Sequence, residues 1–179
     1  GNGNDMAGFF FCVRANHISV RDCEFGSNNG PGMSIGTRDC HNMVEDCWIH
    51  ENSGAGILVR SCPKPCEVHS LGIMRCRING NTREQGGGQV EIGDNAHHIL
   101  LKDNQLSSAP TRRASGVSVA ATAHDICLQG NGFDGCSPRV TAGSRSLVSE
   151  LELVDCGNDA PSPDSFRHLG DVTEEAMGT

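Results

Sequence analysis

The stretch Asn16-His17-Ile18-Ser19-Val20-Arg21-Asp22-Cys23-Glu24-Phe25 decides the fold, because its pattern recurs along the chain. Two apolar residues stand two positions apart, a Cys or Asn follows three residues later, and another apolar residue comes two after that. We call this Cys or Asn the anchor. Full or partial copies place anchors at Cys23, Cys47, Cys76, Asn104, Asn131 and Cys156, which lie 24, 29, 28, 27 and 25 residues apart. A near-constant period of this size indicates a repeat architecture.

A second short strand is predicted between successive anchors, and a glycine usually precedes it. The glycines in question are Gly32, Gly56, Gly88 and Gly116, and we expect them to adopt turn conformations with positive φ. Both predicted strands of a unit alternate with period two, and no helical pattern separates them. Such repeats predict a β-solenoid in which coils stack about 4.8 Å apart and equivalent strands pair in parallel.

The repeated units resemble those of the right-handed parallel β-helix superfamily, the pectin-lyase-like fold. The stretch 16–25 and the run Gly54-Ala55-Gly56-Ile57-Leu58-Val59 carry most of the resemblance, which covers residues 8–156. The predicted fold class is therefore all-β: a right-handed, single-stranded parallel β-helix of about six coils. We expect residues 1–156 to be the repeat domain, cut from a longer solenoid with neighbouring domains. Residues 157–179 form a Pro-rich and acidic tail, predicted to be a cap or disordered.

Composition excludes several classes of function. The 179 residues carry a net charge of −8, which argues against a nucleic-acid binder because phosphate contacts need clustered Lys and Arg. No stretch approaches the ~20 apolar residues of a membrane-spanning helix. Aromatic residues make up only 4% of the chain, with a single Trp and no Tyr. This deficit counts against a sugar-binding groove, which usually offers aromatic faces.

The ten cysteines raise the question of disulfides. Stacking places the anchors in one column, which by alternation with Val20 and Phe25 points inward. Neighbouring anchors then have parallel Cβ vectors, which is poor disulfide geometry. We therefore expect buried, free thiols in this column, with the two Asn anchors bonding to adjacent coils.

Histidines recur at the turn before the first strand of each unit. They are His17, His41, His69, His97, His98 and His124, and each lies six or seven residues before an anchor. We expect them to form an approximate stack near one turn. Two interpretations stay open: imidazoles that stack and cap turn carbonyls, or a metal-binding or catalytic ridge.

One connection between units is richer in chemistry than the others. Arg38-Asp39-Cys40-His41 leads from one unit to the next, and stacking places Arg14, Arg60, Lys64 and His69 on the same edge. In an acidic protein, such a basic edge is suited to an acidic sugar. The alternative is that these are solvated turn residues that form weak Arg–Asp pairs.

The same connections offer a possible metal site. Cys40, Cys62, Cys66 and His69 have the ligand types of tetrahedral zinc, although their spacing is irregular for known zinc modules. A local Cys62–Cys66 disulfide and plain thiols are the alternatives. We predict no cofactor; zinc at these four residues is a minor alternative, and the family resemblance allows calcium.

The resemblance and the basic edge together favour a carbohydrate-active protein, a polysaccharide lyase or epimerase acting on uronic-acid glycans, with a hydrolase-like activity less supported. Such enzymes neutralise a carboxylate and remove the C5 proton. The predicted catalytic residues are Arg38, Asp39 and His41; the predicted substrate-binding residues are Arg14, Trp48, Arg60 and Lys64. The alternative function is a non-catalytic structural, adhesin or glycan-binding solenoid. The expected partner is a polysaccharide or cell-surface glycan, and the resemblance implies an extracellular or cell-envelope location.

Overall fold

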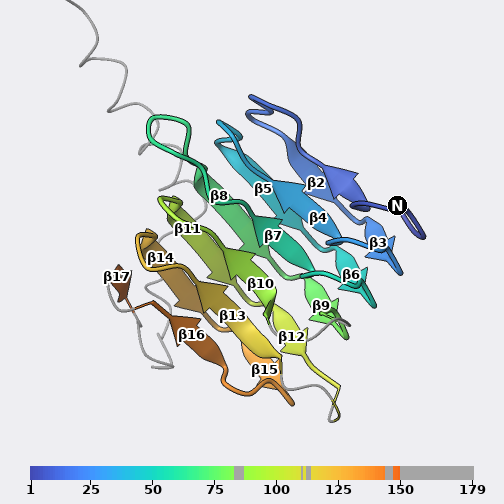
Figure 1. Cartoon of the computed structure of the whole chain (residues 1–179). Coiled ribbons are helices and arrows are strands. Elements are labelled where there is room, and N and C mark those ends of the chain that lie inside the picture. Colours follow the sequence, from blue (N-terminus) through green and yellow to red (C-terminus); the bar gives the residue numbers. More distant parts are fainter. Residues whose placement is uncertain (83–86, 110, 112–113, 144–146, 150–179) are drawn as a thin grey trace, which may run out of the picture.

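Three parallel β-sheets wind around one core in the computed structural model, which describes residues 1–82, 87–109, 111, 114–143 and 147–149 (Figure 1). The chain visits sheet A, then sheet B, then sheet C, and repeats this order. Each strand pairs in parallel with its counterpart one coil away, as at Val44↔Ile73 and Leu106↔Phe133. The described residues contain no helix, so the all-β parallel β-helix predicted from the repeat is confirmed.

The three sheets share the strands as follows. Sheet A contains β1 (Phe9–Phe10), β4 (Met33–Ile35), β7 (Ile57–Val59), β10 (Gly88–Ile92), β13 (Ser115–Val119) and β16 (Val140–Ala142). Sheet B contains β2 (Ser19–Arg21), β5 (Asn42–Glu45), β8 (His69–Met74), β11 (His97–Lys102), β14 (His124–Gln129) and β17 (Leu147–Ser149). Sheet C contains β3 (Glu24–Gly26), β6 (Trp48–His50), β9 (Arg77–Asn79), β12 (Gln105–Ser107) and β15 (Gly132–Asp134).

Each coil has three strands, so the sequence-based expectation of two was wrong. The stretch 18–25 splits into β2 and β3 because Asp22 adopts a left-handed conformation with φ 51° and turns the chain. Later coils have the same conformation at the residue before the anchor: Asp46, Arg75, Asp103 and Gly130. Single left-handed residues are uncommon outside Gly, Asn and Asp. The described strands thus form five three-strand coils followed by β16 and β17.

The glycines before the sheet A strands serve close packing rather than positive φ. None of Gly32, Gly56, Gly88 and Gly116 has a positive φ, which corrects the expectation from the sequence. A Cβ on Gly56 would lie 2.5 Å from the Cγ2 of Ile78 and 2.9 Å from the carbonyl oxygen of Gln89. Glycine is needed here because the backbone lies directly against the core side chains of sheet C.

Four of the six anchors line the interior, as predicted. Cys47, Cys76, Asn104 and Asn131 are buried, while Cys23 in the first coil is exposed and Cys156 lies outside the described residues. Every cysteine among the described residues is a free thiol. The Nδ2 of Asn104 donates to the Ile73 carbonyl oxygen at 2.9 Å and its Oδ1 accepts from the Cys76 N–H at 2.9 Å. The anchor thus bonds one coil to the next through buried polar groups.

A second amide ladder, which the sequence analysis missed, stands at the corner between sheets C and A. Asn28, Asn52, Asn81 and Gln89 are all buried. The Nδ2 of Asn28 donates to the Oδ1 of Asn52 at 2.7 Å, and the Nδ2 of Asn52 donates to the Oδ1 of Asn81 at 2.8 Å. The Nδ2 of Asn81 donates to the Oε1 of Gln89 at 2.9 Å. Each amide satisfies turn groups that burial would otherwise leave without a partner.

Replacing Asn52 tests the importance of this ladder. Asn52→Ala removes the bonds to Asn28, Asn81 and the Phe25 carbonyl oxygen, and leaves buried groups without partners. We expect a loss of about 3 kcal/mol in the free energy of unfolding, measured by urea denaturation. The matched control Asn29→Ala, at an exposed amide in the equivalent turn one coil earlier, should change it by less than about 0.5 kcal/mol. Equal losses in the two variants would contradict the structural role of the ladder.

Candidate functional site

The predicted histidine stack is a continuous column at the corner where sheet A leads into sheet B, which we call the A–B corner. The column contains His17, His41, His69, His97 and His124. Successive ring centroids are 5.1, 5.2, 5.1 and 4.9 Å apart. The rings stack with interplanar angles of 13° or less, except that those of His41 and His69 meet edge to face.

The two spacings in the sequence, six and seven residues before the anchor, have a backbone explanation. In each of the five coils, the residue six positions before the anchor has a left-handed backbone conformation, with φ between 51° and 58°. These residues are His17, His41, Ser70, His98 and Asp125. In the later coils the column histidine is instead the first residue of the sheet B strand, and His97 pairs in register with both His69 and His124. The rings therefore stay in one column although their backbone positions differ by one residue.

Burial keeps the middle of the histidine column uncharged. It lowers the pKa of His41 and His69, and it lowers the pKa of His97 to about 4, with the neighbouring imidazoles adding to the effect. Glu67 opposes this for His97, whose Nε2 lies 3.9 Å from the Glu67 Oε1. Near neutral pH these imidazoles are neutral and are able to accept a proton.

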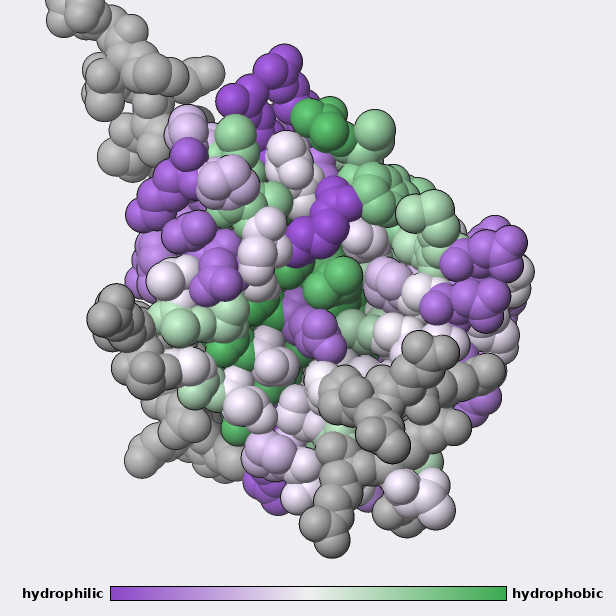
Figure 2. All heavy atoms as spheres, viewed as in Figure 1, coloured by the Kyte–Doolittle hydropathy of each residue, from purple (hydrophilic) through white to green (hydrophobic). Residues whose placement is uncertain are grey.

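The predicted basic residues lie along the same corner, but they differ in exposure and in the contacts that their side chains make. Arg14 and Lys64 are exposed. Arg38 is partly buried and its Nε donates to the Cys66 sulfur at 3.2 Å. The guanidinium of Arg60 lies 4.2 Å from the Phe10 ring centroid and 4.0 Å from the Asp39 Oδ2. Figure 2 shows hydrophilic residues gathered at this corner, at the upper left of the view. Arg14, Arg38 and Lys64 are therefore the cations best placed to meet a ligand.

Asp39 has a structural role that the sequence did not reveal. Its side chain is fully buried, and its carboxylate accepts the N–H of Ala15 at 2.8 Å and the N–H of Gly36 at 2.9 Å. These bonds join two coils at the turn. A carboxylate with this burial and these partners is poorly placed to exchange a proton with an external polymer, so a catalytic role for Asp39 stays a prediction.

The thiols of the A–B corner do not converge on a metal site. Cys40, Cys62 and Cys66 are free, so the alternative of a Cys62–Cys66 disulfide is wrong. The Cys62 sulfur accepts the Thr37 N–H at 3.0 Å, and burial raises the pKa of the Cys40 thiol, which opposes the thiolate that zinc requires. Within the described ranges, no three His, Cys, Asp or Glu side chains are grouped to hold a metal ion. Zinc and calcium thus lack a grouped set of ligands within these ranges, and both alternatives stay predictions.

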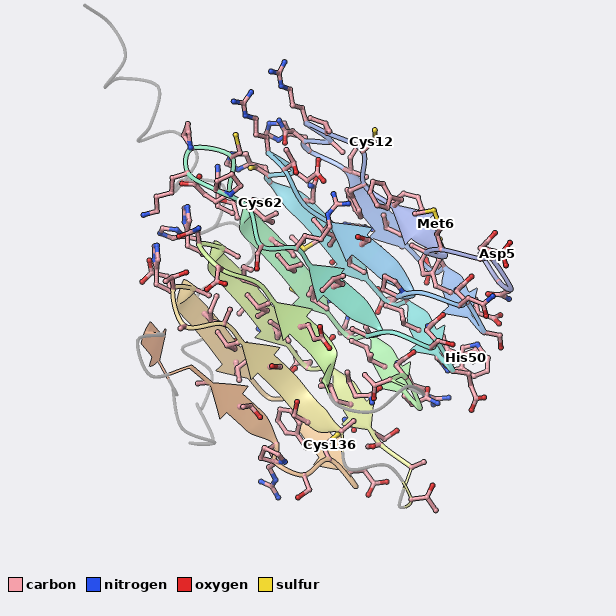
Figure 3. All side chains as sticks on the ribbon, viewed as in Figure 1. Asp5, Met6, Cys12, His50, Cys62 and Cys136 are labelled. Atoms are coloured by element: carbon pink, nitrogen blue, oxygen red, sulfur yellow. The ribbon has the colours of Figure 1, made fainter. Side chains whose placement is uncertain are left out.

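Trp48 lies apart from the corner, on the outer face of sheet C. It borders a hollow of about 400 Å³ lined by Trp48, Arg77, Asn79, Gln105, Leu106, Ser107 and Asp134. In Figure 3, His50 of the same strand lies at the opposite edge of the solenoid from Cys62 of the A–B corner. Trp48 therefore belongs to a different surface from Arg38 and His41. The other polar residues that line the hollow could have been predicted from the alternation of inward and outward residues along β6, β9, β12 and β15.

This stack of coils, with polar surfaces on its turns and outer faces, defines a parallel β-helix. A family model described as "Right handed beta helix region" matches residues 2–137, and the chain belongs to that family. Among solved structures, the A-module of the mannuronan C-5 epimerase AlgE4 of Azotobacter vinelandii is similar, with 13% identity and a TM-score of 0.62. The AlgE6 A-module of the same organism has 16% identity and a TM-score of 0.65.

The two structural likenesses cover 83% of this chain but only 50% and 48% of the epimerase modules. The chain thus spans about half the length of those modules, and at this identity the likeness is one of fold. No curated protein matches the sequence. In the part of the chain that the structure describes, no helix is long and apolar enough to cross a membrane.

Acidification is expected to destabilise the protein through the histidine column. Between pH 6.5, near the pKa of a free histidine, and the folded pKa of His97 at about 4, the unfolded chain binds more protons than the folded one. The free energy of unfolding therefore falls as the pH decreases through this window. His97 alone should account for about 2 kcal/mol of the loss between pH 7.5 and pH 5.

Urea unfolding midpoints at pH 7.5, 6 and 5 measure this effect. His97→Gln should flatten the dependence of stability on pH, whatever its effect at pH 7.5. A wild-type midpoint that stays constant from pH 7.5 to pH 5 would contradict the burial of neutral imidazoles in the column.

Proposed function

We propose that this protein is a carbohydrate-active β-helix that acts on an acidic, uronic-acid polysaccharide at the A–B corner. The observation that carries the proposal is the histidine column, which follows the edge that presents Arg14, Arg38 and Lys64 and in which burial lowers the pKa of His41. This edge offers both a base and cations in a chain whose net charge is −8. Repetition of the column over successive coils suits a polymer, because neighbouring sugars meet similar surroundings.

The proposed chemistry begins with removal of the C5 proton, which lies next to the carboxylate of a uronic acid. A cation on the carboxylate stabilises the negative charge that develops, and Arg38 or Lys64 is assigned this role. His41 is assigned the role of base, because it is half-buried, its pKa is lowered by burial, and it follows Arg38 by three residues. In epimerisation, water returns a proton to the opposite face of C5 and His41 releases the abstracted proton to solvent. In cleavage, a C4–C5 double bond forms as the C4–O bond breaks, and the departing oxygen takes up the proton that His41 removed.

The similar solved structures support the substrate class. Both are modules of mannuronan C-5 epimerases, which by name act on C5 of a uronic-acid polymer. At 13% and 16% identity, the likeness assigns no catalytic residue to this chain. An extracellular or cell-envelope location is part of the proposal, because such polymers lie outside the cell.

A non-catalytic glycan-binding solenoid is the second candidate. It is favoured by the contacts of Asp39 and Arg60: the carboxylate holds two backbone N–H groups and the guanidinium covers Phe10. With both side chains occupied, no acidic side chain among the described residues forms an ion pair with His41 of the kind that orients a catalytic imidazole. Under this alternative the corner binds an acidic glycan without turnover.

Turnover of acidic glycans by variants of the A–B corner decides between these functions. Pectate, alginate and glycosaminoglycans are the substrates; absorbance of the unsaturated product detects cleavage, and proton NMR detects inversion at C5. His41→Gln is expected to lower kcat at least 100-fold, because it removes the base. Arg38→Gln should raise KM about tenfold through loss of the carboxylate contact.

Lys102→Gln is the control, since it removes one positive charge from the outer face of sheet B, away from the corner. It should leave kcat and KM unchanged. If wild type turns over none of these substrates but binds one of them, and Arg38→Gln weakens that binding, the non-catalytic candidate is correct. If turnover is present and His41→Gln retains full kcat, the assignment of His41 is wrong.

A further inference from the structure

The outer face of sheet C carries a strip of polar side chains that the chemistry of the A–B corner does not use. Its two outward rows follow the strand register. One row contains Glu24, Trp48, Arg77, Gln105 and Gly132, and the other contains Gly26, His50, Asn79, Ser107 and Asp134. The 400 Å³ hollow lies over the middle of this strip. We call it the sheet C hollow.

Trp48 is held as a fixed aromatic surface at one side of the hollow. Its indole Nε1 donates to the Oδ1 of Asn79 at 2.8 Å, and its ring stacks on His50 with centroids 4.0 Å apart. His50 is held in turn by the Glu24 carboxylate, 3.1 Å from its Nε2. The Trp48 side chain is nevertheless 43% exposed. An aromatic ring fixed in this way loses little conformational entropy when a ligand packs on it.

Arg77 supplies a cation beside this ring. Arg77 is exposed and pairs in register with Trp48 on the adjacent strand. No carboxylate among the described residues lies within 4.0 Å of its guanidinium nitrogens. Of the two carboxylates of the strip, Glu24 is engaged with His50, and Asp134 lines the hollow two coils beyond Arg77. An anionic group placed near Trp48 therefore meets Arg77 first.

We propose that the sheet C hollow binds an acidic oligosaccharide, with one sugar ring packed on Trp48 and a carboxylate on Arg77. The amide of Gln105 and the hydroxyl of Ser107 are the hydrogen-bonding groups for sugar hydroxyls on the next coil. Coils repeat about every 4.8 Å, close to the length of one sugar residue in an extended chain, so consecutive sugars meet consecutive strands. The inference takes its ligand class from the proposed function, but it concerns a separate surface.

Intrinsic fluorescence tests the proposal directly, because Trp48 is the only Trp and the chain has no Tyr. The probes are tetramers of galacturonate and of mannuronate, with neutral cellotetraose for comparison. We expect a saturable change in Trp48 emission with at least one acidic tetramer, and an affinity for cellotetraose at least tenfold lower. Higher salt should weaken the acidic complex, because the Arg77 contact is exposed.

Arg77→Gln is the decisive variant, expected to weaken acidic binding about tenfold while leaving the melting temperature unchanged, since Arg77 is exposed. Lys102→Gln, the charge-matched control, should bind like wild type. No saturable emission change with either acidic tetramer overturns the proposal. So does unchanged affinity in Arg77→Gln, or equal affinity for cellotetraose.

These experiments test the proposals for the two surfaces independently. If wild type lacks turnover but Trp48 emission still reports binding that depends on Arg77, the proposed binding in the hollow is supported and the proposed enzymatic activity of the corner is wrong. If turnover depends on His41 and Arg38 while Trp48 emission never changes, the proposed activity of the corner is supported and the proposed binding in the hollow is wrong.

Discussion

Buried carboxamide side chains join each coil of this protein to the next. At the turns, backbone groups leave the strand ladders and would be buried without partners. Asn28, Asn52 and Asn81 close this gap at the corner between sheets C and A, and Asn104 with Asn131 does so at the turn between sheets B and C. Because an Asn side chain donates and accepts at once, it bonds in both directions along the stack. The position of every outward side chain depends on this register.

Much of the fold could be predicted from the spacing of the anchors alone. The period fixes which residues stack, and alternation fixes which point inward, so the burial of Cys47 and Cys76 followed directly. The third sheet could not be predicted, because the break between β2 and β3 is a single left-handed residue at Asp22, and aspartate is compatible with many other conformations. The ladder of Asn28, Asn52 and Asn81 was missed because those residues lie among loop-like Ser, Asn and Gly.

The candidate sites were predictable in position but not in environment. The repeat places Arg38, Asp39 and His41 at one corner, but only the structure shows that the Asp39 carboxylate is buried on two backbone N–H groups. Likewise, Trp48 was predicted to bind substrate, but the sequence did not show that its partner Asn79 belongs to the next coil, 31 residues away. Sequence patterns give the direction of a side chain; its partners and exposure depend on lateral contacts between coils.

The stacking of five imidazoles about 5 Å apart also determines how the column takes up protons. A charge on one ring raises the free-energy cost of a charge on the rings above and below it, so neighbouring sites cannot titrate independently. In the middle of the column this repulsion adds to burial in lowering the pKa of His41, His69 and His97. Proton uptake by these three rings is therefore coupled along the stack, and a change at one ring alters the pKa of the next.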